Sequence, residues 1–369
     1  MIPVDSATPL AVGVVGTGTI ARAVHLPLLA RSPQTTVAAV SDLDTARAAQ
    51  VAAAYGARAL TTAELLADAA VEAVLVTTPG DHPTLVEAAL RAGKHVLAEK
   101  PLALASDDAE RLGALAAVSG LVLQVGYMKA HDAALPALRA ALDEVGEARV
   151  VQVRVRHPTD APQLAHLRPA GPPPQLDEAA LASVAASDAA DAAAVRRAVG
   201  EVPQPWQRLY RQVLCGSVLH ELALLRATGL GLPRVTRAHL SAWDGGQPPV
   251  LLVSGELPGG AALELVWAWL PDFPEYQEVL EVSATAGSVR LEVAAPYAVD
   301  APSALEVLSH RPGGGAALRR EVLGRDGAFQ RQLEAFVASV RTGAPVTGTA
   351  DEAAEDARWL ADLLTLLRA

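Results

Sequence analysis

The sequence predicts an α/β protein: a doubly wound parallel sheet, then a second domain with an open, mainly antiparallel sheet. In the first third of the chain, short apolar runs alternate with helix-length segments, as buried parallel strands and crossover helices do. A glycine-rich turn follows the first run. Beyond residue 125, apolar and polar residues alternate, as in half-buried antiparallel strands. A chain of 369 residues accommodates two domains, which we expect at 1–125 and 126–369.

The elements of the first domain can be assigned in order. Residues 11–15 form a continuous apolar run that ends at Gly16, which predicts a buried strand. Gly56 and Gly93 each follow a helix-length segment, where glycine commonly ends a helix. We expect strands at 11–15, 36–40, 73–77, 95–98 and 122–125, and helices at 20–30, 43–55, 83–92 and 106–119.

The second domain has the pattern of a sheet followed by helices. Residues 150–156 alternate strictly, and Gly and Pro separate the later apolar stretches. We expect strands at 150–156, 251–257, 261–269, 277–283 and 288–293, and helices at 328–341 and 350–367. The closing helices, within 328–369, can pack back on the first domain.

Residues 158–205 fit neither pattern, because they are rich in Ala, Pro and Asp. Their alanine-rich middle, 177–199, can form helices. Two interpretations stay open for this insertion: a surface segment, or a lid over an active site, since long ordered loops are often functional.

The composition excludes several classes of protein. Thirty Lys and Arg against 41 Asp and Glu give a net charge of −11, which argues against nucleic-acid and anionic-membrane partners. No apolar run is long enough to predict a membrane span, and residues 1–10 do not resemble a signal peptide. The single Cys215 excludes an internal disulfide and a cysteine-built metal cluster. We expect a cytoplasmic protein without a metal site.

The glycine-rich turn carries the first functional signal. Gly16 permits the tight turn, and Gly18 lets the backbone approach a pyrophosphate at the start of the helix that Thr19 and Ile20 open. Asp42 ends the second strand, where an acidic residue can bind the ribose hydroxyls of a dinucleotide. Because Asp42 would repel a 2′-phosphate, we expect NAD rather than NADP. A glycine-rich turn without a nucleotide is the alternative.

Two further strand ends should meet at the same crevice. Thr78 and Pro79 can border the nicotinamide ribose, and His82 is either a helix-start residue or a neighbour of the cofactor. Glu99 and Lys100 end the fourth strand, directly before a proline. Lys100 can bind a substrate hydroxyl and assist its deprotonation, or it can anchor the ribose. The alternative without a catalytic role is a surface ion pair between Glu99 and Lys100.

Together these motifs resemble the Gfo/Idh/MocA family of glucose–fructose oxidoreductase, inositol dehydrogenase and their relatives. The resemblance covers nearly the whole chain except 158–205, and its matching segments are 12–22, 38–44, 77–82, 92–101 and 125–129. It implies an amino-terminal Rossmann domain and NAD(P)-linked hydride transfer on a sugar, cyclitol or related polyol. It also implies a homodimer or homotetramer.

Family members carry an Asp-x-x-x-His pair on a helix of the second domain. Here His220 matches the histidine, but Gly216 stands at the aspartate position. His220 can still act as a general base, since histidine titrates near neutral pH. Lys129 and His131 lie in the segment where the family has a basic substrate contact, and His157 can point into the site from the end of its strand.

The leading hypothesis is an NAD(P)-dependent dehydrogenase or reductase in which Lys100 and His220 share the proton handling and Lys129 positions the substrate. Gly216 keeps a second hypothesis open, a regulatory protein that binds the dinucleotide without catalysis. A third is an enzyme that uses tightly bound NAD for transient oxidation during elimination or epimerisation.

Overall fold

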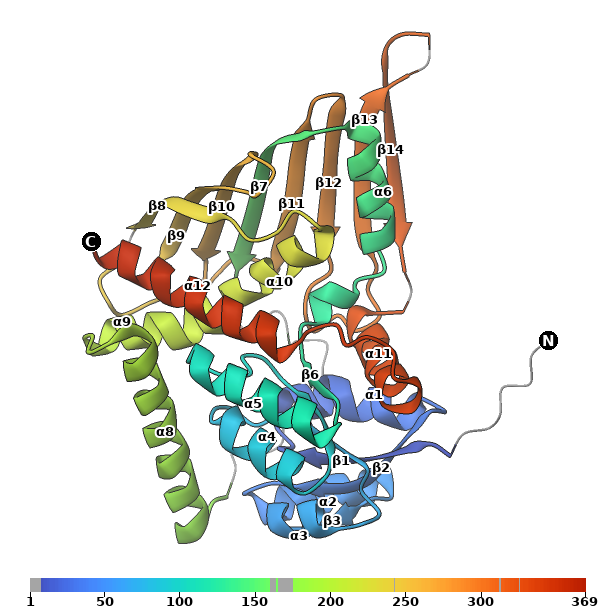
Figure 1. The fold of residues 1–369 in the computed structure, drawn as a ribbon, viewed down its shortest axis with the longest axis vertical. Helices are drawn as coiled ribbons and strands as arrows, with labels where there is room; N and C mark the ends of the chain where they lie inside the picture. The colour runs from blue at the N-terminus through green and yellow to red at the C-terminus, as the bar shows by residue number, and fades with distance from the viewer. Residues whose placement is uncertain (1–7, 160–163, 165–174, 242, 312, 325) are drawn as a thin grey trace, which may run out of the picture. The chain divides into compact units, whose positions relative to one another are not determined.

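The computed structural model describes residues 8–159, 164, 175–241, 243–311, 313–324 and 326–369 (Figure 1). Contacts within the chain divide it into two compact units. The first contains the described residues of Met1–Gly126, Pro169–Gly200 and Gln332–Arg358. The second contains the described residues of Tyr127–Arg168, Glu201–Arg331 and Trp359–Ala369.

The first unit is built on a six-stranded parallel sheet with the order β3-β2-β1-β4-β5-β6. Its strands are β1 Leu10–Val15, β2 Thr35–Ser41, β3 Arg58–Ala59, β4 Ala73–Val76, β5 His95–Ala98 and β6 Leu123–Val125. The strand order reverses between β1 and β4, and ligands of such sheets bind at the carboxyl ends of the strands beside this point. Because β1 and β4 are covered on both faces, they read as unbroken apolar runs.

Helices connect these strands, and their ends have recognisable signals. They are η1 Ala21–His25 (a π-helix), α1 Leu26–Arg31, α2 Thr45–Tyr55, α3 Thr62–Ala67, α4 His82–Arg91 and α5 Ser106–Ser119. The Asp44 side chain caps α2 by accepting from the Arg47 backbone nitrogen at 3.0 Å, and Gly56 ends that helix in the left-handed conformation. Thr61 and Glu64 form a capping box at the start of α3.

Two segments distant in sequence complete the first unit. The alanine-rich part of the insertion forms α8, Glu178–Val199, which Asp177 caps. The stretch Gln332–Arg358 contains parts of α11 Ala328–Thr342 and α12 Ala350–Arg368. Arg341 in α11 holds Glu72, with 2.7 Å between Nη1 and Oε1. The remaining parts of the predicted insertion, 160–163 and 165–174, lie outside the described residues.

The second unit is built on an eight-stranded sheet with the order β14-β13-β12-β11-β7-β10-β9-β8. Its strands are β7 Ala148–His157, β8 Arg234–Ser241, β9 Val250–Glu256, β10 Ala262–Trp269, β11 Gln277–Ala284, β12 Gly287–Val293, β13 Ser303–His310 and β14 Ala316–Leu323. All neighbours pair antiparallel except β7 and β10, which pair parallel. The two sheets confirm the predicted fold class.

One face of this second sheet carries helices and the other carries charge pairs. Val151, Val153 and Val155 of β7 are buried, whereas Arg154 between them pairs with Glu281 at 3.2 Å. The helices are α6 Leu135–Val145, α9 Gln204–Arg208, the π-helix η3 Leu209–Val218 and α10 Leu219–Thr228, with the short 3-10 helix η2 Met128–His131 before them. α6 lies against β12 and β13 (Figure 1), and α10 packs on η2, η3 and α6.

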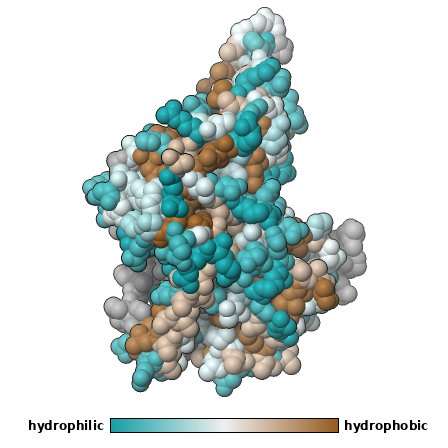
Figure 2. Space-filling model, turned by 60° about the vertical axis from the view of Figure 1, so that its left-hand side comes forward, coloured by the Kyte–Doolittle hydropathy of each residue, from teal (hydrophilic) through white to brown (hydrophobic). Residues whose placement is uncertain are grey.

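In the part of the chain that the structure describes, every helix is too short or too polar to traverse a bilayer. The face drawn in Figure 2 mixes hydrophilic and hydrophobic patches over both ends of the view.

Candidate functional site

The glycine turn after β1 is open where a dinucleotide would lie. Gly16 has φ +92°, and a Cβ atom there would lie 2.9 Å from the backbone nitrogen of Thr78, so only glycine fits. A Cβ atom at Gly18 would meet nothing within 4 Å among the described residues, so that side of the turn is free for a ligand. The backbone N–H groups of Thr19 and Ile20 lie in the first helical turn, where a helix offers unpaired donors to an anion.

Asp42 is fixed beside this turn by four hydrogen bonds. Its Oδ2 accepts from the Thr17 backbone nitrogen at 2.7 Å and from Thr17 Oγ1 at 2.6 Å. Its Oδ1 accepts from the Asp44 backbone nitrogen at 2.9 Å and from Arg47 Nη2 at 2.7 Å. Burial alone would raise the pKa of Asp42, but the bonds from Arg47 and Thr17 outweigh it and lower that pKa below its usual value. The carboxylate is therefore ionised and held at the end of β2.

The turn after β4 brings one unpaired polar atom to the same edge of the sheet. Thr77 Oγ1 donates to the Gly16 carbonyl at 2.6 Å and joins the two turns. Thr78 Oγ1 is buried and has no hydrogen-bond partner among the described residues. Such an orphaned hydroxyl fits a polar group of a ligand, because an unsatisfied buried polar atom costs free energy. Pro79 follows it directly.

His82 ties the same turn to the end of β5. Its Nε2 lies 2.6 Å from the Thr78 carbonyl oxygen and its Nδ1 lies 2.8 Å from the Pro101 carbonyl oxygen. Both partners are acceptors, so each ring nitrogen faces a backbone carbonyl oxygen, and a neutral ring donates to one of the two. The geometry favours the helix-start interpretation of His82 over direct contact with a cofactor.

Glu99 and Lys100 occupy the end of β5, where the Lys100–Pro101 peptide is cis. Glu99 is buried, and its Oε1 lies 2.8 Å from Nε2 of His25, while its Oε2 accepts from the Lys100 backbone nitrogen at 3.2 Å. Burial raises the pKa of Glu99, but His25 more than offsets this and lowers it. Sequence reasoning missed His25, whose only signal is a polar residue in the apolar run between Val24 and Leu26.

In the second unit, His220 lies in the first turn of α10, directly after the π-helix η3. Irregular π-segments are frequent at functional sites. A Cβ atom at Gly216, inside η3, would lie 3.3 Å from the Arg211 carbonyl oxygen. This contact is with the backbone of η3 itself, and the position that matches the family aspartate lacks a carboxylate.

Lys129 is the centre of a buried charge cluster. It is 1% exposed, and its Nζ lies 3.0 Å from Glu221 Oε1 and also contacts Glu278 Oε2. Tyr276 donates its hydroxyl to Glu278 Oε2 at 2.6 Å. Burial lowers the pKa of Lys129, but the two glutamates raise it overall, so the ammonium stays charged. This placement favours a structural role for Lys129 over direct contact with a substrate.

Glu221 in the same cluster favours its protonated form. Burial and the neighbouring Glu278 raise the pKa of Glu221 well above its usual value, although Lys129 lowers it in part. One lysine balances one carboxylate, so the neutral form of Glu221 avoids a second buried negative charge.

Replacing Glu221 with glutamine is expected to flatten the pH dependence of stability. Because the folded state raises the pKa of Glu221, folding takes up a proton, and this contribution is full at acidic pH and lost as the pH rises above the usual glutamate range. Urea unfolding at a series of pH values would show the wild type losing stability relative to Glu221→Gln as the pH rises. Parallel curves for the two proteins would contradict the shared-proton assignment.

The remaining candidates lie near the ends of β7 and η2. The His157 ring is 5.5 Å from those of Trp269 and Tyr276 and 5.6 Å from that of Trp267, and its Nδ1 lies 2.8 Å from the Pro158 carbonyl oxygen. His157 therefore belongs to an aromatic cluster at the carboxyl ends of β7 and β10. Burial lowers the pKa of His131 to about 4, so its ring is neutral at physiological pH.

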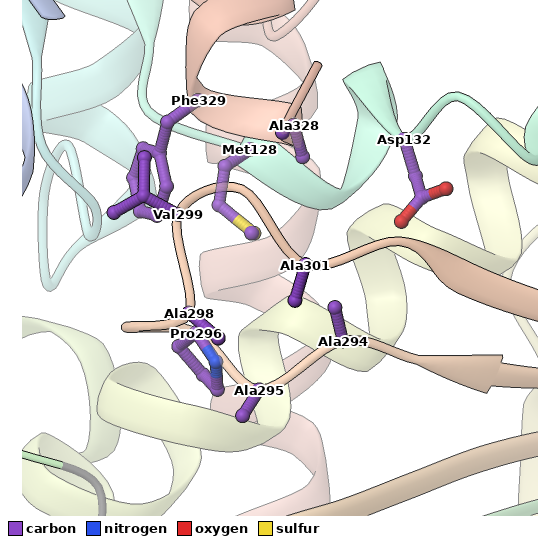
Figure 3. A pocket seen from close by; sticks show the side chains of 11 residues that line it. Met128, Asp132, Ala294, Ala295, Pro296, Ala298, Val299, Ala301, Ala328 and Phe329 are labelled. Carbon is purple, nitrogen blue, oxygen red and sulfur yellow. The ribbon is translucent and has the colours of Figure 1, made fainter. Parts of the chain in front are cut away.

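Figure 3 shows a small pocket in the second unit that is poorly suited to a sugar. Most of its walls are alanine, proline and valine side chains between residues 294 and 301, together with Met128 and Phe329. Its carboxylate, Asp132, already accepts from Ser303 Oγ at 2.6 Å and from the Ala134 backbone nitrogen at 2.8 Å. We do not assign this pocket to a substrate.

The amino-terminal third of the chain is similar to known oxidoreductases. Residues 10–127 match the Gfo/Idh/MocA family model, described as an oxidoreductase family with an NAD-binding Rossmann fold. A dTDP-3,4-didehydro-2,6-dideoxy-alpha-D-glucose 3-reductase of Streptomyces antibioticus is 45% identical over 33% of this chain and 38% of its own length. An inositol 2-dehydrogenase 3 of Saccharopolyspora erythraea is 40% identical over 37% and 41%. The chain thus spans about two fifths of the length of the curated relatives it matches.

Solved structures match over almost the whole chain. KijD10, a 3-ketoreductase from Actinomadura kijaniata crystallised with NADP and TDP-benzene, superposes with a TM-score of 0.73 over 98% of both chains at 22% identity. A putative myo-inositol dehydrogenase from Sinorhizobium meliloti 1021 gives 0.66 over 96% of this chain and 95% of its own, also at 22% identity. At this level of identity the likeness establishes the shared fold.

Proposed function

We propose that the protein is an NAD-dependent oxidoreductase, because residues 10–127 match the model of the Gfo/Idh/MocA oxidoreductase family with its NAD-binding Rossmann fold. Its reaction transfers a hydride between a nicotinamide cofactor and a hydroxyl or ketone carbon of a sugar, cyclitol or related polyol. Support for this substrate class comes from the sugar reductase and inositol dehydrogenase relatives.

One observation carries the proposal: a cradle for a dinucleotide at the carboxyl edge of the parallel sheet. Gly18 leaves free space beside the backbone N–H groups at the start of the helix, Asp42 is ionised at the end of β2, and Thr78 Oγ1 lacks a partner among the described residues. These groups fit a pyrophosphate, a ribose diol and a further polar ligand group. The cofactor, when bound, accepts or supplies the hydride.

The protein's own residues handle the proton and orient the substrate. Lys100 follows the buried Glu99 at the end of β5, and its ammonium is expected to polarise and position the reacting hydroxyl. His220 is expected to accept the hydroxyl proton in oxidation as imidazole and to return it in reduction as imidazolium, because histidine interconverts between these forms near neutral pH. His131 and His157 remain candidate substrate contacts, and Glu99, Pro79 and His82 support the cofactor loops.

The choice between NAD and NADP depends on Asp42. We expect Asp42→Ala to weaken NADH binding about tenfold and to improve NADPH binding, because a charged hydrogen bond contributes about 1.5–3 kcal/mol. The change also frees Arg47, now 2.7 Å from Asp42, to meet a 2′-phosphate. Titration calorimetry with the four dinucleotides measures both effects. Adding Arg47→Ala should abolish the gain for NADPH, and equal affinity of the wild type for NADH and NADPH would refute the ribose assignment.

A substrate screen tests the whole proposal. The full chain is incubated with NAD and a panel of sugars, cyclitols and nucleotide-linked sugars, and with NADH and the matching ketones, while the absorbance of reduced nicotinamide is followed. Turnover with at least one polyol or keto-sugar is expected. Binding of the dinucleotide without turnover of any panel member would favour the non-catalytic alternative.

Gly216 keeps a second candidate function open, a dinucleotide-binding regulator, because this position lacks a carboxylate. A third candidate is an enzyme that uses tightly bound NAD for transient oxidation during elimination or epimerisation. NAD recovered from the denatured protein, together with no net reduction of added NAD, would identify the latter. We also expect a cytoplasmic homodimer or homotetramer, which light scattering of the purified protein would test.

A further inference from the structure

Helix α8, the described helix within the insertion at 158–205, is packed through its second half. Asp191, Ala194 and Val195 are buried there, whereas Leu181 and Val184 of the first half are exposed. Asp191 is 6% exposed, and a carboxylate is rarely this buried without a specific partner. Its Oδ1 accepts from the Asp81 backbone nitrogen at 3.0 Å. The helix therefore holds the turn that follows β4.

The backbone of that turn adopts an unfavourable, left-handed conformation at two successive residues. Gly80 has φ +91° and Asp81 has φ +38°, the one positive value for a non-glycine residue in the described chain. This left-handed region is unfavourable for residues with a Cβ atom, although Asp tolerates it better than most. A Cβ atom at Gly80 would lie 2.8 Å from Asp191 Oδ2 and 3.4 Å from Ser187 Oγ. Ser187 and Asp191 are one helical turn apart, so one face of α8 packs on the turn.

The Thr78–His82 turn also contacts the chain at the ends of β4 and β5, beside the candidate cofactor site. Thr78, with its orphaned hydroxyl, precedes Gly80, and His82 follows Asp81. The His82 ring is within hydrogen-bond distance of the Thr78 and Pro101 carbonyl oxygens, and Pro101 directly follows Lys100. A change at Asp81 is therefore transmitted to the ends of β4 and β5.

Two more contacts place the insertion along the same edge. The Gln175 backbone nitrogen donates to Asp44 Oδ2 at 3.2 Å, two residues beyond Asp42. At the other end of α8, Arg197 Nε donates to Asp107 Oδ2 at 3.1 Å and also pairs with Asp108, both in the first turn of α5. The 22 residues of α8 are about 33 Å long at 1.5 Å per residue. Figure 1 shows α8 as a long helix of the first unit.

From these contacts we infer that α8 is a clamp for the cofactor-binding edge and that Asp191 is a positioning residue, which holds the Thr78–His82 turn in its binding conformation through the Asp81 N–H. The ordering of the turn is inferred from the contacts of α8 alone. The second consequence, tighter binding of the dinucleotide, rests on the proposed function.

Asp191→Ala tests both parts by two measurements. Hydrogen exchange of the ligand-free protein should speed up about tenfold or more in peptides covering 78–84 and stay unchanged in α5, because the Asp81 N–H loses its acceptor. The Kd for NADH should rise about tenfold, because part of the binding free energy then orders the turn. Asp191→Asn, which keeps an acceptor oxygen, should stay within about threefold of the wild type for both quantities.

Asp188→Ala is the matched control, an exposed aspartate on the same helix, and should leave both quantities unchanged. Exchange rates and Kd values in Asp191→Ala within twofold of the wild type would overturn the inference. If the wild type binds no dinucleotide, the proposed function fails, and hydrogen exchange alone decides whether α8 orders the turn. Should the alanine variant fail to fold, Asp191→Ser, whose hydroxyl is too short to reach Asp81, gives the same two comparisons.

Discussion

Replacing Lys100 with alanine is expected to lower kcat about 10²- to 10⁴-fold, the range that a positioned proton-transfer group contributes. The loss should appear mainly in kcat, because Lys100 is expected to act on the developing charge of the substrate oxygen more than on ground-state binding. Steady-state kinetics on the substrate found by the screen, with NADH affinity measured separately, would separate the two effects. Turnover within a few-fold of the wild type would remove Lys100 from the mechanism.

Lys94→Ala is a suitable control because it removes a lysine from the same strand region without touching the proposed chemistry. Lys94 Nζ donates to the carbonyl oxygens of Asp68 and Val71, both at 2.7 Å. Its loss should reduce the free energy of unfolding while kcat per folded molecule stays unchanged. A parallel fall in kcat for both variants would indicate general damage to the first unit.

Replacing Lys129 with methionine is expected to reduce the free energy of unfolding by about 3–5 kcal/mol, the usual cost of breaking a buried ion pair. The lysine is 1% exposed, and its removal leaves Glu221 and Glu278, both buried, without their cation. Urea unfolding at neutral pH measures the loss. Adding Glu221→Gln and Glu278→Gln to the same protein should restore most of it, because no buried carboxylate is then left to ionise without a cation.

These variants also separate the two roles considered for Lys129. A substrate contact predicts a raised KM with little change in stability, whereas the buried cluster predicts the reverse. A loss of stability below about 1 kcal/mol, within the range of exposed ion pairs, would contradict the structural role.

The sequence predicted the sheets best where burial dictates the pattern. Continuous apolar runs identified five strands of the first sheet, but β3 has only two residues, both exposed, and leaves no periodic signal. β8 and β14 were missed because most of their residues are exposed, so no apolar face alternates with a polar one. β13 was also missed, although half its residues are buried. The parallel pairing of β7 with β10 could not be read from alternation, which is the same in either direction.

The site was predictable where a motif is local and not where partners are distant in sequence. The glycine turn and Asp42 could be placed at adjacent strand ends because topology brings those ends together. The contacts of Glu99 with His25 and of Asp81 with Asp191 join residues 74 and 110 positions apart, and no periodicity links them. The enclosure of Lys129 by Glu221 and Glu278 was not predictable, because these residues lie 92 and 149 positions further along the chain.

The central claim is that the cradle after β1 binds a nicotinamide dinucleotide through Gly18 and Asp42. Titration calorimetry of the full chain with NAD, NADH, NADP and NADPH, after a check for nucleotide carried over from expression, tests it most directly. We predict one site per chain with preference for NAD or NADH. No heat of binding with any of the four, and no nucleotide released on denaturation, would contradict it.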